Sequence, residues 1–467
     1  MKKNKYDVFY KLLKDNDLYV PVVLCLGAFL TRFGFLALSD NFKGPQPMLN
    51  IITSLHIFKY PGFMQNIYYQ QLPVFLYSLF AVIKIGGDQI LCGRLLSVFW
   101  GSISIAPFYY LISRIFTKKI SAFSALLLCF YPVHVITSVI TVPDLMGLFF
   151  LLSALCFLQE QRNVLSAVFI CLATACTYVS WLFVFILPVF ITAKKQSFRQ
   201  GLKDALGFFL IASFFTLLWI MVTNNIYKEH NLFYKNFFEA RSFFEYLFAF
   251  MQTVSMITRQ LFSFPLPLLF LFGLAGIYQS AKMRKYYDFF FLIGALVLAL
   301  AFGIFRQEIN IIEQGLLILS IFLIPFIILG LDFILRVFRL GKNKYMAAAL
   351  TMICFNMLFL SIYARPYLPK KIKDLSSWLK DNVQDTNAEL FINKDNNPYF
   401  SSIIMLSRLP QGNFHYYKAD DMDFLELKRD VKNYFIYSGA IDADMRENFI
   451  EAVRFDEYGV LTRLDKK

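Results

Sequence analysis

Long apolar runs separated by short polar segments dominate the first 365 residues of the chain. Because the hydrocarbon core of a bilayer needs about 20 apolar residues per helix, each run of roughly that length predicts a membrane-spanning helix. We predict about eleven spans by this measure, near residues 18–38, 94–115, 120–139, 143–159, 164–179, 180–193, 204–223, 260–280, 286–305, 310–335 and 344–363. The expected fold class is a predominantly α-helical polytopic membrane protein.

One apolar segment, from Leu72 to Ile85, is too short for a comfortable span because it has only about 14 residues and opens on Leu72-Pro73. We interpret it as a helix that lies in the outer membrane interface, with the Lys84 ammonium group extended toward the headgroups. The clusters of lysine and arginine then fall on alternate connections, as the positive-inside rule requires. This topology predicts a cytoplasmic N-terminus and an exterior C-terminus.

The composition changes sharply after Arg365-Pro366. The pattern beyond this point predicts an amphipathic helix at 370–382 and strands at 389–393, 434–438 and 459–464. These elements are typical of a small α/β domain.

The predicted organisation is therefore a transmembrane domain over residues 1–365 and an exterior α/β domain over 366–467. Two long exterior loops interrupt the transmembrane domain, at residues 40–93 and 224–259. The second loop carries charges at helical spacing among phenylalanines, which favours an amphipathic interfacial helix, and a solvated connector is the alternative.

Composition agrees with a membrane protein. Of the 467 residues, 58% are hydrophobic and 17% are charged, whereas soluble domains average about 25% charged residues. The net charge of +14 comes from short basic clusters between apolar runs, which suit anionic headgroups rather than nucleic acid. The seven cysteines lie in or beside apolar segments, and their spacing indicates neither a disulfide framework nor a zinc site.

Two aspartates are the candidate catalytic residues. Asp40 directly follows the first span, and Asp144 follows Pro143 at the first turn of a later helix that begins on the same side of the membrane. A carboxylate can take the proton of an acceptor hydroxyl or amine while a phosphate leaves, which is what a sugar transferase needs. Helix capping or contact with headgroups is the alternative for both residues.

Several cations fall on the exterior side in this topology. Arg94 opens an apolar helix after a glycine-rich turn, and its guanidinium suits bidentate binding of a lipid phosphate. Anchoring to ordinary phospholipid headgroups explains Arg94 equally well. Lys84, Arg259 and Arg306 are further candidates for binding the phosphate of a lipid substrate.

Other polar residues point less clearly to chemistry. Arg32 lies inside the first span, which implies an internal partner or a polar cavity. His56 and His134 lack metal-ligand spacing, and the Asp-x-Asp pattern at Asp421 to Asp423 precedes a helical run, where capping explains it. No cofactor is expected, because no glycine-rich phosphate loop or catalytic triad is visible, and the need for a divalent metal stays open.

The order of these features resembles the GT-C superfamily of polytopic glycosyltransferases. The likeness is strongest to the bacterial branch related to the protein O-mannosyltransferases and the aminoarabinose lipid A transferases. The matching stretches extend over about the first 160 residues. They are Asp40, Leu72-Pro73-Val74-Phe75-Leu76-Tyr77, Gly86-Gly87-Asp88 through Arg94-Leu95-Leu96-Ser97, Tyr109-Tyr110-Leu111-Ile112-Ser113-Arg114, Tyr131-Pro132-Val133-His134 to Ser138, and Asp144.

This resemblance implies a multi-pass enzyme of the cell (plasma or inner) membrane, in contact with membrane lipids. It implies inverting transfer of a sugar from a polyprenyl-phosphate donor to a glycan, lipid or protein acceptor outside the membrane. Asp40 would be the base, Asp144 a second acidic residue, and Arg94 a neighbour of the lipid phosphate. The alternatives are a transporter or flippase of lipid-linked sugars, for which no internal repeat is visible, and a non-catalytic membrane scaffold.

Overall fold

The computed structural model describes residues 19–39, 46–56, 72–195, 197–226, 266–283, 293–294, 297, 309–337, 351–354, 356–357, 370–383, 389–393, 403, 407, 414–417, 433–438, 449–455 and 458–463. The chain divides into two compact units, one of residues 1–39 and 57–365 and the other of residues 40–56 and 366–467. Asp40, Arg259, Arg306 and most of the second predicted exterior loop lie outside the described residues.

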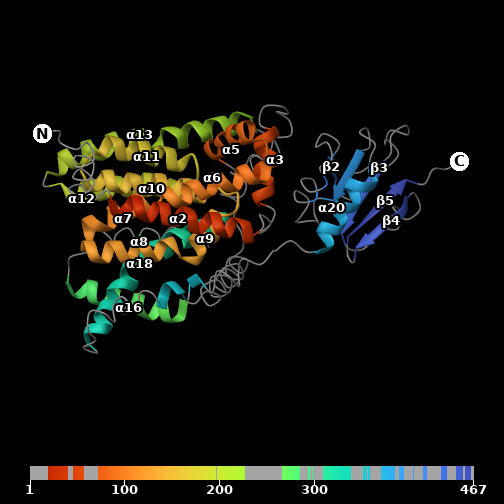
Figure 1. The fold of residues 1–467 in the computed structure, drawn as a ribbon. Helices are drawn as coiled ribbons and strands as arrows, with labels where there is room; N and C mark the ends of the chain where they lie inside the picture. The colour runs from red at the N-terminus through yellow and green to blue at the C-terminus, as the bar shows by residue number, and fades with distance from the viewer. Residues whose placement is uncertain are drawn as a thin grey trace, which may run out of the picture. The chain divides into compact units, whose positions relative to one another are not determined.

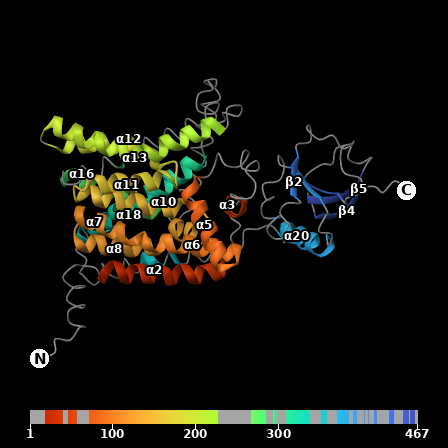
Figure 2. The same ribbon diagram turned by 90° about the horizontal axis from the view of Figure 1, so that it is seen from above.

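The first unit is a bundle of helices that run side by side (Figure 1). These helices are α2 (Tyr19–Leu38), α5 (Pro73–Gly86), α6 (Gln89–Ile103), α7 (Ile105–Ile115), α8 (Lys118–Cys129), α9 (Pro132–Ser138), α10 (Asp144–Gln159), α11 (Asn163–Thr174), α12 (Ser180–Lys194), α13 (Phe198–Ile226), α16 (Leu266–Met283) and α18 (Ile309–Val337). Helices α2 and α13 lie on opposite sides of this unit (Figure 2).

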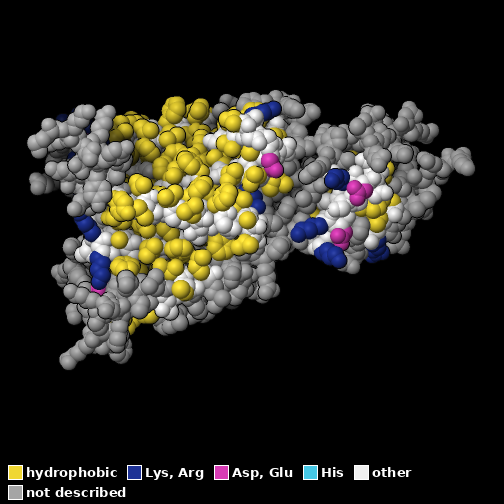
Figure 3. Space-filling view, in the orientation of Figure 1, with side chains coloured by type: hydrophobic (Ala, Val, Ile, Leu, Met, Phe, Trp, Pro, Cys, Tyr) yellow, Lys and Arg dark blue, Asp and Glu magenta, His cyan; other side chains and the backbone are white. Residues whose placement is uncertain are grey.

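The described helices include four that are long and apolar enough to cross a membrane, within 19–38, 89–115, 198–221 and 314–335. The bent pair α8 and α9 raises this number to five if it forms one span. Only 22% of the first of these segments and 28% of the third are buried in the protein, against 67% of the other two. Helices α2 and α13 therefore present broad apolar surfaces to lipid, and the outer face of the unit is largely hydrophobic (Figure 3).

The predicted spans correspond to helices wherever the structure describes them, with two instructive differences. The span predicted at 120–139 breaks into α8 and α9, which meet at an angle of 52° because Pro132 cannot continue the helix. The second difference is the turn between α11 and α12, which the sequence did not reveal. The Trp181 indole donates a hydrogen bond across this turn to the Thr174 carbonyl at 2.9 Å. The total of eleven spans stays a prediction.

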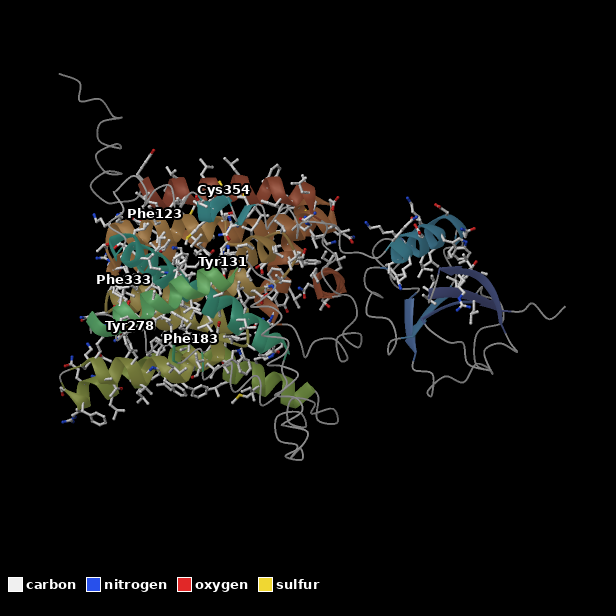
Figure 4. The ribbon with its side chains drawn as sticks, turned by 90° about the horizontal axis from the view of Figure 1, so that it is seen from below. Phe123, Tyr131, Phe183, Tyr278, Phe333 and Cys354 are labelled. Carbon is white, nitrogen blue, oxygen red and sulfur yellow. The ribbon has the colours of Figure 1, made fainter. Side chains whose placement is uncertain are left out.

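Helices α16 and α18 cross in direct backbone contact. A Cβ atom added at Gly276 would overlap the Phe326 carbonyl, and one added at Gly330 would overlap the Phe272 carbonyl. Glycine is required at both positions because only glycine lets two helix backbones approach so closely. Helix α18 also packs on α8, and Tyr131, which follows α8 closely in the chain, is buried in the interior of the unit (Figure 4).

The second unit contains α3 (Gln46–His56), α20 (Lys370–Asn382) and one mixed five-stranded sheet. Its strands are β1 (Glu389–Asn393), β2 (Phe414–Tyr417), β3 (Asn433–Ser438), β4 (Phe449–Phe455) and β5 (Tyr458–Arg463). The strand order is β2-β1-β3-β5-β4, with β1 parallel to β2 and β3, and β5 antiparallel to β3 and β4. The predicted helix and three strands are all present, and β2 and β4 complete the sheet.

Candidate functional site

Three helix ends meet around the Arg94 side chain. Arg94 lies in the second turn of α6. The N-cap residue of this helix is Asp88, whose carboxylate accepts a hydrogen bond from the Leu91 amide at 2.8 Å. Arg94 Nε donates to the Val139 carbonyl at 2.8 Å, and Nη2 donates to the carbonyl and the hydroxyl of Ser39 at 2.9 and 2.8 Å. Arg94 is only 8% exposed, so its guanidinium serves as an internal connection between chain segments.

The groups that accept from Arg94 lie at helix C-termini. Ser39 follows α2, and its amide and hydroxyl both return to the Phe35 carbonyl, at 2.9 and 2.8 Å. Val139 is the C-cap residue of α9. Carbonyls at a helix C-terminus have no partner within the helix and carry a partial negative charge, so they suit a guanidinium. Arg94 thereby connects the C-terminal ends of α2 and α9 to α6 and to each other.

The hydrogen bonds of Arg94 reach chain segments that lead to both candidate aspartates. Asp40 lies outside the described residues, but it directly follows Ser39, which Arg94 holds. Asp144 is the first residue of α10, is partly exposed, and comes five residues after Val139. The segments that lead to the two aspartates therefore meet at one guanidinium.

Small residues on α6 allow α9 to pack closely against it. A Cβ atom added at Gly93 would overlap the Thr141 side chain, and one added at Gly101 would overlap Ser138. The buried Ser97 lies between these glycines, one helical turn from each. Small residues at this spacing let helices approach in a membrane, which brings the Val139 carbonyl within reach of Arg94.

Helix α5 covers part of the same end of the bundle. The Val74 amide in its first turn donates to the Ala175 carbonyl at 3.3 Å, in the turn between α11 and α12. That turn also contacts α10, because Thr177 lies directly against Gly147. Lys84, in the last turn of α5, is exposed and lies 5.5 Å from the centre of the Phe80 ring. Of the predicted phosphate-binding residues, the structure describes Lys84 and Arg94; it places Lys84 on the surface and Arg94 in the interior.

Arg32 is fully buried and has the internal partners that its position in α2 predicted. Its Nε donates to the Ser138 hydroxyl at 3.0 Å, and Nη1 donates to the carbonyls of Ala28 and Cys129 at 2.9 and 3.2 Å. The Cys129 carbonyl is the last of α8, at the break before α9. Among the described residues no carboxylate pairs with Arg32, so neutral oxygens at a helix C-terminus compensate its charge.

His134 completes the environment of Arg32. Nη2 of Arg32 and Nδ1 of His134 are 2.6 Å apart, and Nε2 of His134 lies 3.1 Å from the Ser104 hydroxyl. A guanidinium has only donors, so Nδ1 must accept and the proton of the neutral ring must be on Nε2. His134 therefore links α2 to the junction between α6 and α7. This structural role agrees with the lack of metal-ligand spacing around His134 in the sequence.

Replacement of Arg32 by leucine is expected to lower the stability of the fold by about 2–5 kcal/mol, because it leaves the Cys129 carbonyl and His134 Nδ1 buried without a donor. Thermal unfolding of the purified protein in detergent measures this loss. The double variant Arg32→Leu, His134→Leu is the control, and it is expected to lose less than the sum of the single variants because both partners are absent. Strict additivity would contradict the bond between the two side chains.

No group of three or more histidine, cysteine, aspartate or glutamate side chains within the described residues could hold a metal ion. The residues that sequence analysis missed are Ser39 and Val139, which take part chiefly through backbone carbonyls. Ser39 is 55 residues from Arg94 and Val139 is 45 residues from it. No local pattern signals such pairs, although the ends of two helices on the same side of a bundle were predictable.

Comparison with known proteins identifies the fold. Residues 70–220 match the model of the dolichyl-phosphate-mannose-protein mannosyltransferase family. No curated protein is similar enough to the chain to count as a match. Among solved structures, ArnT from Cupriavidus metallidurans bound to undecaprenyl phosphate is similar, with a TM-score of 0.62, 12% identity, and coverage of 95% of this chain and 98% of ArnT.

Two structures of the oligosaccharyltransferase from Archaeoglobus fulgidus are also similar. The complex with Zn and sulfate has a TM-score of 0.53 and 15% identity, and the match covers 84% of this chain and 61% of the enzyme. The complex of this enzyme, AglB, with an inhibitory peptide and a dolichol-phosphate has a TM-score of 0.51 and 14% identity, with 84% and 63% coverage. The chain thus spans about three-fifths of the length of the oligosaccharyltransferase. It is a multi-pass membrane protein, and the resemblance to the GT-C superfamily is confirmed: the chain has the fold of these membrane glycosyltransferases.

Proposed function

We propose that the protein transfers a sugar from a polyprenyl-phosphate donor to an acceptor at the outer face of the membrane. The observation that carries this proposal is the meeting of the segments before Asp40 and Asp144 at Arg94, at one end of a bundle with the GT-C fold. The similar ArnT structure contains undecaprenyl phosphate and the AglB structure contains a dolichol-phosphate. Both ligands carry one phosphate on a polyprenyl chain, which supports the same class of donor here.

In the proposed reaction Asp40 is the general base. Its carboxylate takes the proton from the acceptor hydroxyl or amine, and the oxygen or nitrogen attacks the anomeric carbon of the sugar. The bond between that carbon and the phosphate oxygen breaks on the opposite side, so the configuration inverts. The polyprenyl phosphate leaves with the electron pair of this bond.

The other predicted residues assist these groups. Asp144 lies near the acceptor or the sugar and orients it. Lys84, Arg259 and Arg306 are proposed to stabilise negative charge on the departing phosphate. The exposed position of Lys84 beside Phe80 suits contact with a headgroup-level phosphate. No step requires a cofactor. Metal titration of the purified protein tests whether the reaction depends on a divalent ion.

The proposed orientation has a cytoplasmic N-terminus in the plasma or inner membrane, with the Arg94 end of the bundle outside. Charged side chains connect the helices at the other end: Arg114 and Arg162 lie 3.4 and 3.5 Å from Glu160, and Lys194 donates to Gln159 at 3.3 Å. A concentration of lysine and arginine at one end of a bundle is typical of the cytoplasmic side.

Mass spectrometry of envelope lipids, polysaccharides and proteins, from cells with and without the protein, tests the proposal. We expect one or more acceptors to lose a single pentose or hexose when the protein is absent. Purified protein in vesicles, supplied with the extracted lipid-linked sugar and the acceptor from cells that lack the protein, should then restore that increment. Identical masses in all three fractions would contradict transferase activity. A flippase is supported instead if the vesicles move the lipid-linked sugar between leaflets without consuming it.

A further inference from the structure

The Arg94 guanidinium is buried and hydrogen-bonded within the protein, whereas Lys84 is exposed. Three hydrogen bonds from Nε and Nη2 connect it to Ser39 and Val139. It is 8% exposed, and the segment after α9 packs on α6 beside it, with Thr141 against Gly93. A residue that grips a lipid phosphate needs its donors directed at the ligand, whereas these donors are directed at two helix ends.

The acceptors of Arg94 belong to the two segments on which the proposed chemistry depends. Ser39 precedes Asp40 directly, and no further residue separates the clamped carbonyl from the proposed base. Val139 begins the segment 139–143 that leads to Asp144, and Thr141 in this segment lies against Gly93 on α6. A movement at either end would therefore shift Ser39 relative to the segment that leads to Asp144.

The fork of the guanidinium explains why arginine is present. Nε and Nη2 point along one edge of a rigid plane, so one side chain reaches Ser39 and Val139 at the same time in fixed geometry. Lysine has a single ammonium group on a flexible stem and cannot reproduce this arrangement, although it keeps the charge.

We infer that Arg94 is a positioning residue: it fixes the C-terminal ends of α2 and α9 and thereby holds Ser39, the residue before Asp40, beside the start of the segment that leads to Asp144. This inference rests on the proposed function for its catalytic consequence, and it replaces phosphate binding as the role of Arg94. We call the hydrogen bonds from Arg94 to Ser39 and Val139 the clamp. The clamp is a property of the fold, so it can be measured without any enzyme assay.

Hydrogen exchange measured by mass spectrometry on full-length protein tests the clamp directly. The Ser39 amide donates to Phe35 at 2.9 Å and the Val139 amide donates to Ile136 at 3.2 Å, so peptides that contain them report fraying of α2 and α9. Arg94→Lys is expected to speed exchange in both peptides about tenfold or more, because charge-assisted hydrogen bonds are lost. Unchanged exchange in both peptides would overturn the inference.

Two further variants make this measurement specific. Arg114→Lys is the matched control, because Arg114 is exposed and pairs with Glu160 at the opposite end of the bundle; exchange near Ser39 and Val139 should match the wild type. Ser39→Ala removes one acceptor and keeps the Ser39 carbonyl, so it should speed exchange only in the peptide of α2. This mild variant keeps the test decisive if Arg94→Lys does not accumulate, since unchanged exchange near Ser39 would overturn the clamp.

Binding and kinetics separate positioning from phosphate binding. Undecaprenyl phosphate, added to detergent-solubilised protein, should raise the Tm of the wild type and of Arg94→Lys by the same amount. The kcat of Arg94→Lys should fall by about 100-fold, as small misplacements of reacting groups do, with the KM for the lipid donor within about twofold. A loss of the Tm shift together with a raised KM would assign Arg94 to the phosphate and overturn the inference. Failure of undecaprenyl phosphate to stabilise the wild type would count against the proposed function and leave the exchange result intact.

Discussion

Replacement of Asp40 by asparagine should reduce sugar transfer by about 10²–10⁴-fold, which is what a general base contributes. Asparagine keeps the size and polarity of the side chain and removes only the ability to accept a proton. The segment before it should stay in place, because Arg94 holds Ser39 through groups that this substitution does not touch. Transfer of labelled sugar to the acceptor identified by mass spectrometry measures the effect.

The control for this prediction is Asp88→Asn. Asp88 is an exposed carboxylate before α6, at the same end of the bundle, and its role is to cap the Leu91 amide. Asparagine caps a helix about as well as aspartate, so this variant loses a nearby negative charge without losing structure. We expect activity close to that of the wild type. If Asp40→Asn retains full transfer activity at equal protein level, Asp40 is not the base.

Replacement of Gly330 by leucine should have the largest effect on stability, because Gly330 lies where α16 and α18 cross. The first side-chain carbon would already overlap the Phe272 carbonyl, which is backbone and cannot rotate away. The two helices must separate, and α18 also carries Phe326, which contacts Phe116 on the α8 side. We expect a loss of at least about 3 kcal/mol, seen as a much lower Tm and poor recovery of monodisperse protein in detergent.

The matched control is Gly207→Leu on α13. Gly207 is exposed, and no atom lies within 4 Å of a Cβ atom added there, so a leucine at this lipid-facing position should leave the Tm within about 2 °C. A Gly330→Leu protein as stable as this control would show that α16 and α18 do not cross at these glycines.

Local patterns in the sequence predicted much of the fold. The helix α20 and the strand β1 begin and end where expected, and the apolar runs gave α2 and the joined α6 and α7 to within a few residues. Strand β4 was missed because Glu451 and Arg454 interrupt its apolar pattern and a bulge between Glu451 and Val453 shifts its register. The break at Pro132 was visible in the sequence, but the length of the surrounding apolar run favoured one continuous span.

Predictions of the site were limited by a different factor. The sequence identified Arg32, Arg94 and Asp144 as unusual because polar groups in apolar surroundings are costly. It did not reveal which way each side chain turns. Arg94 turns inward because glycines on α6 bring α9 close, and such packing between distant segments leaves no local signal. Asp40, the predicted base, stays a prediction.

The positions of the Arg32 partners in the chain determine when these contacts can form during synthesis. Cys129 and Ser138 follow Arg32 by 97 and 106 residues, which a ribosome adds in roughly 5–20 s at typical rates of synthesis. During this interval a charged side chain in the first helix has no acceptor other than its own helix and water. Helix α2 can therefore make these contacts only after α8 and α9 have been synthesised.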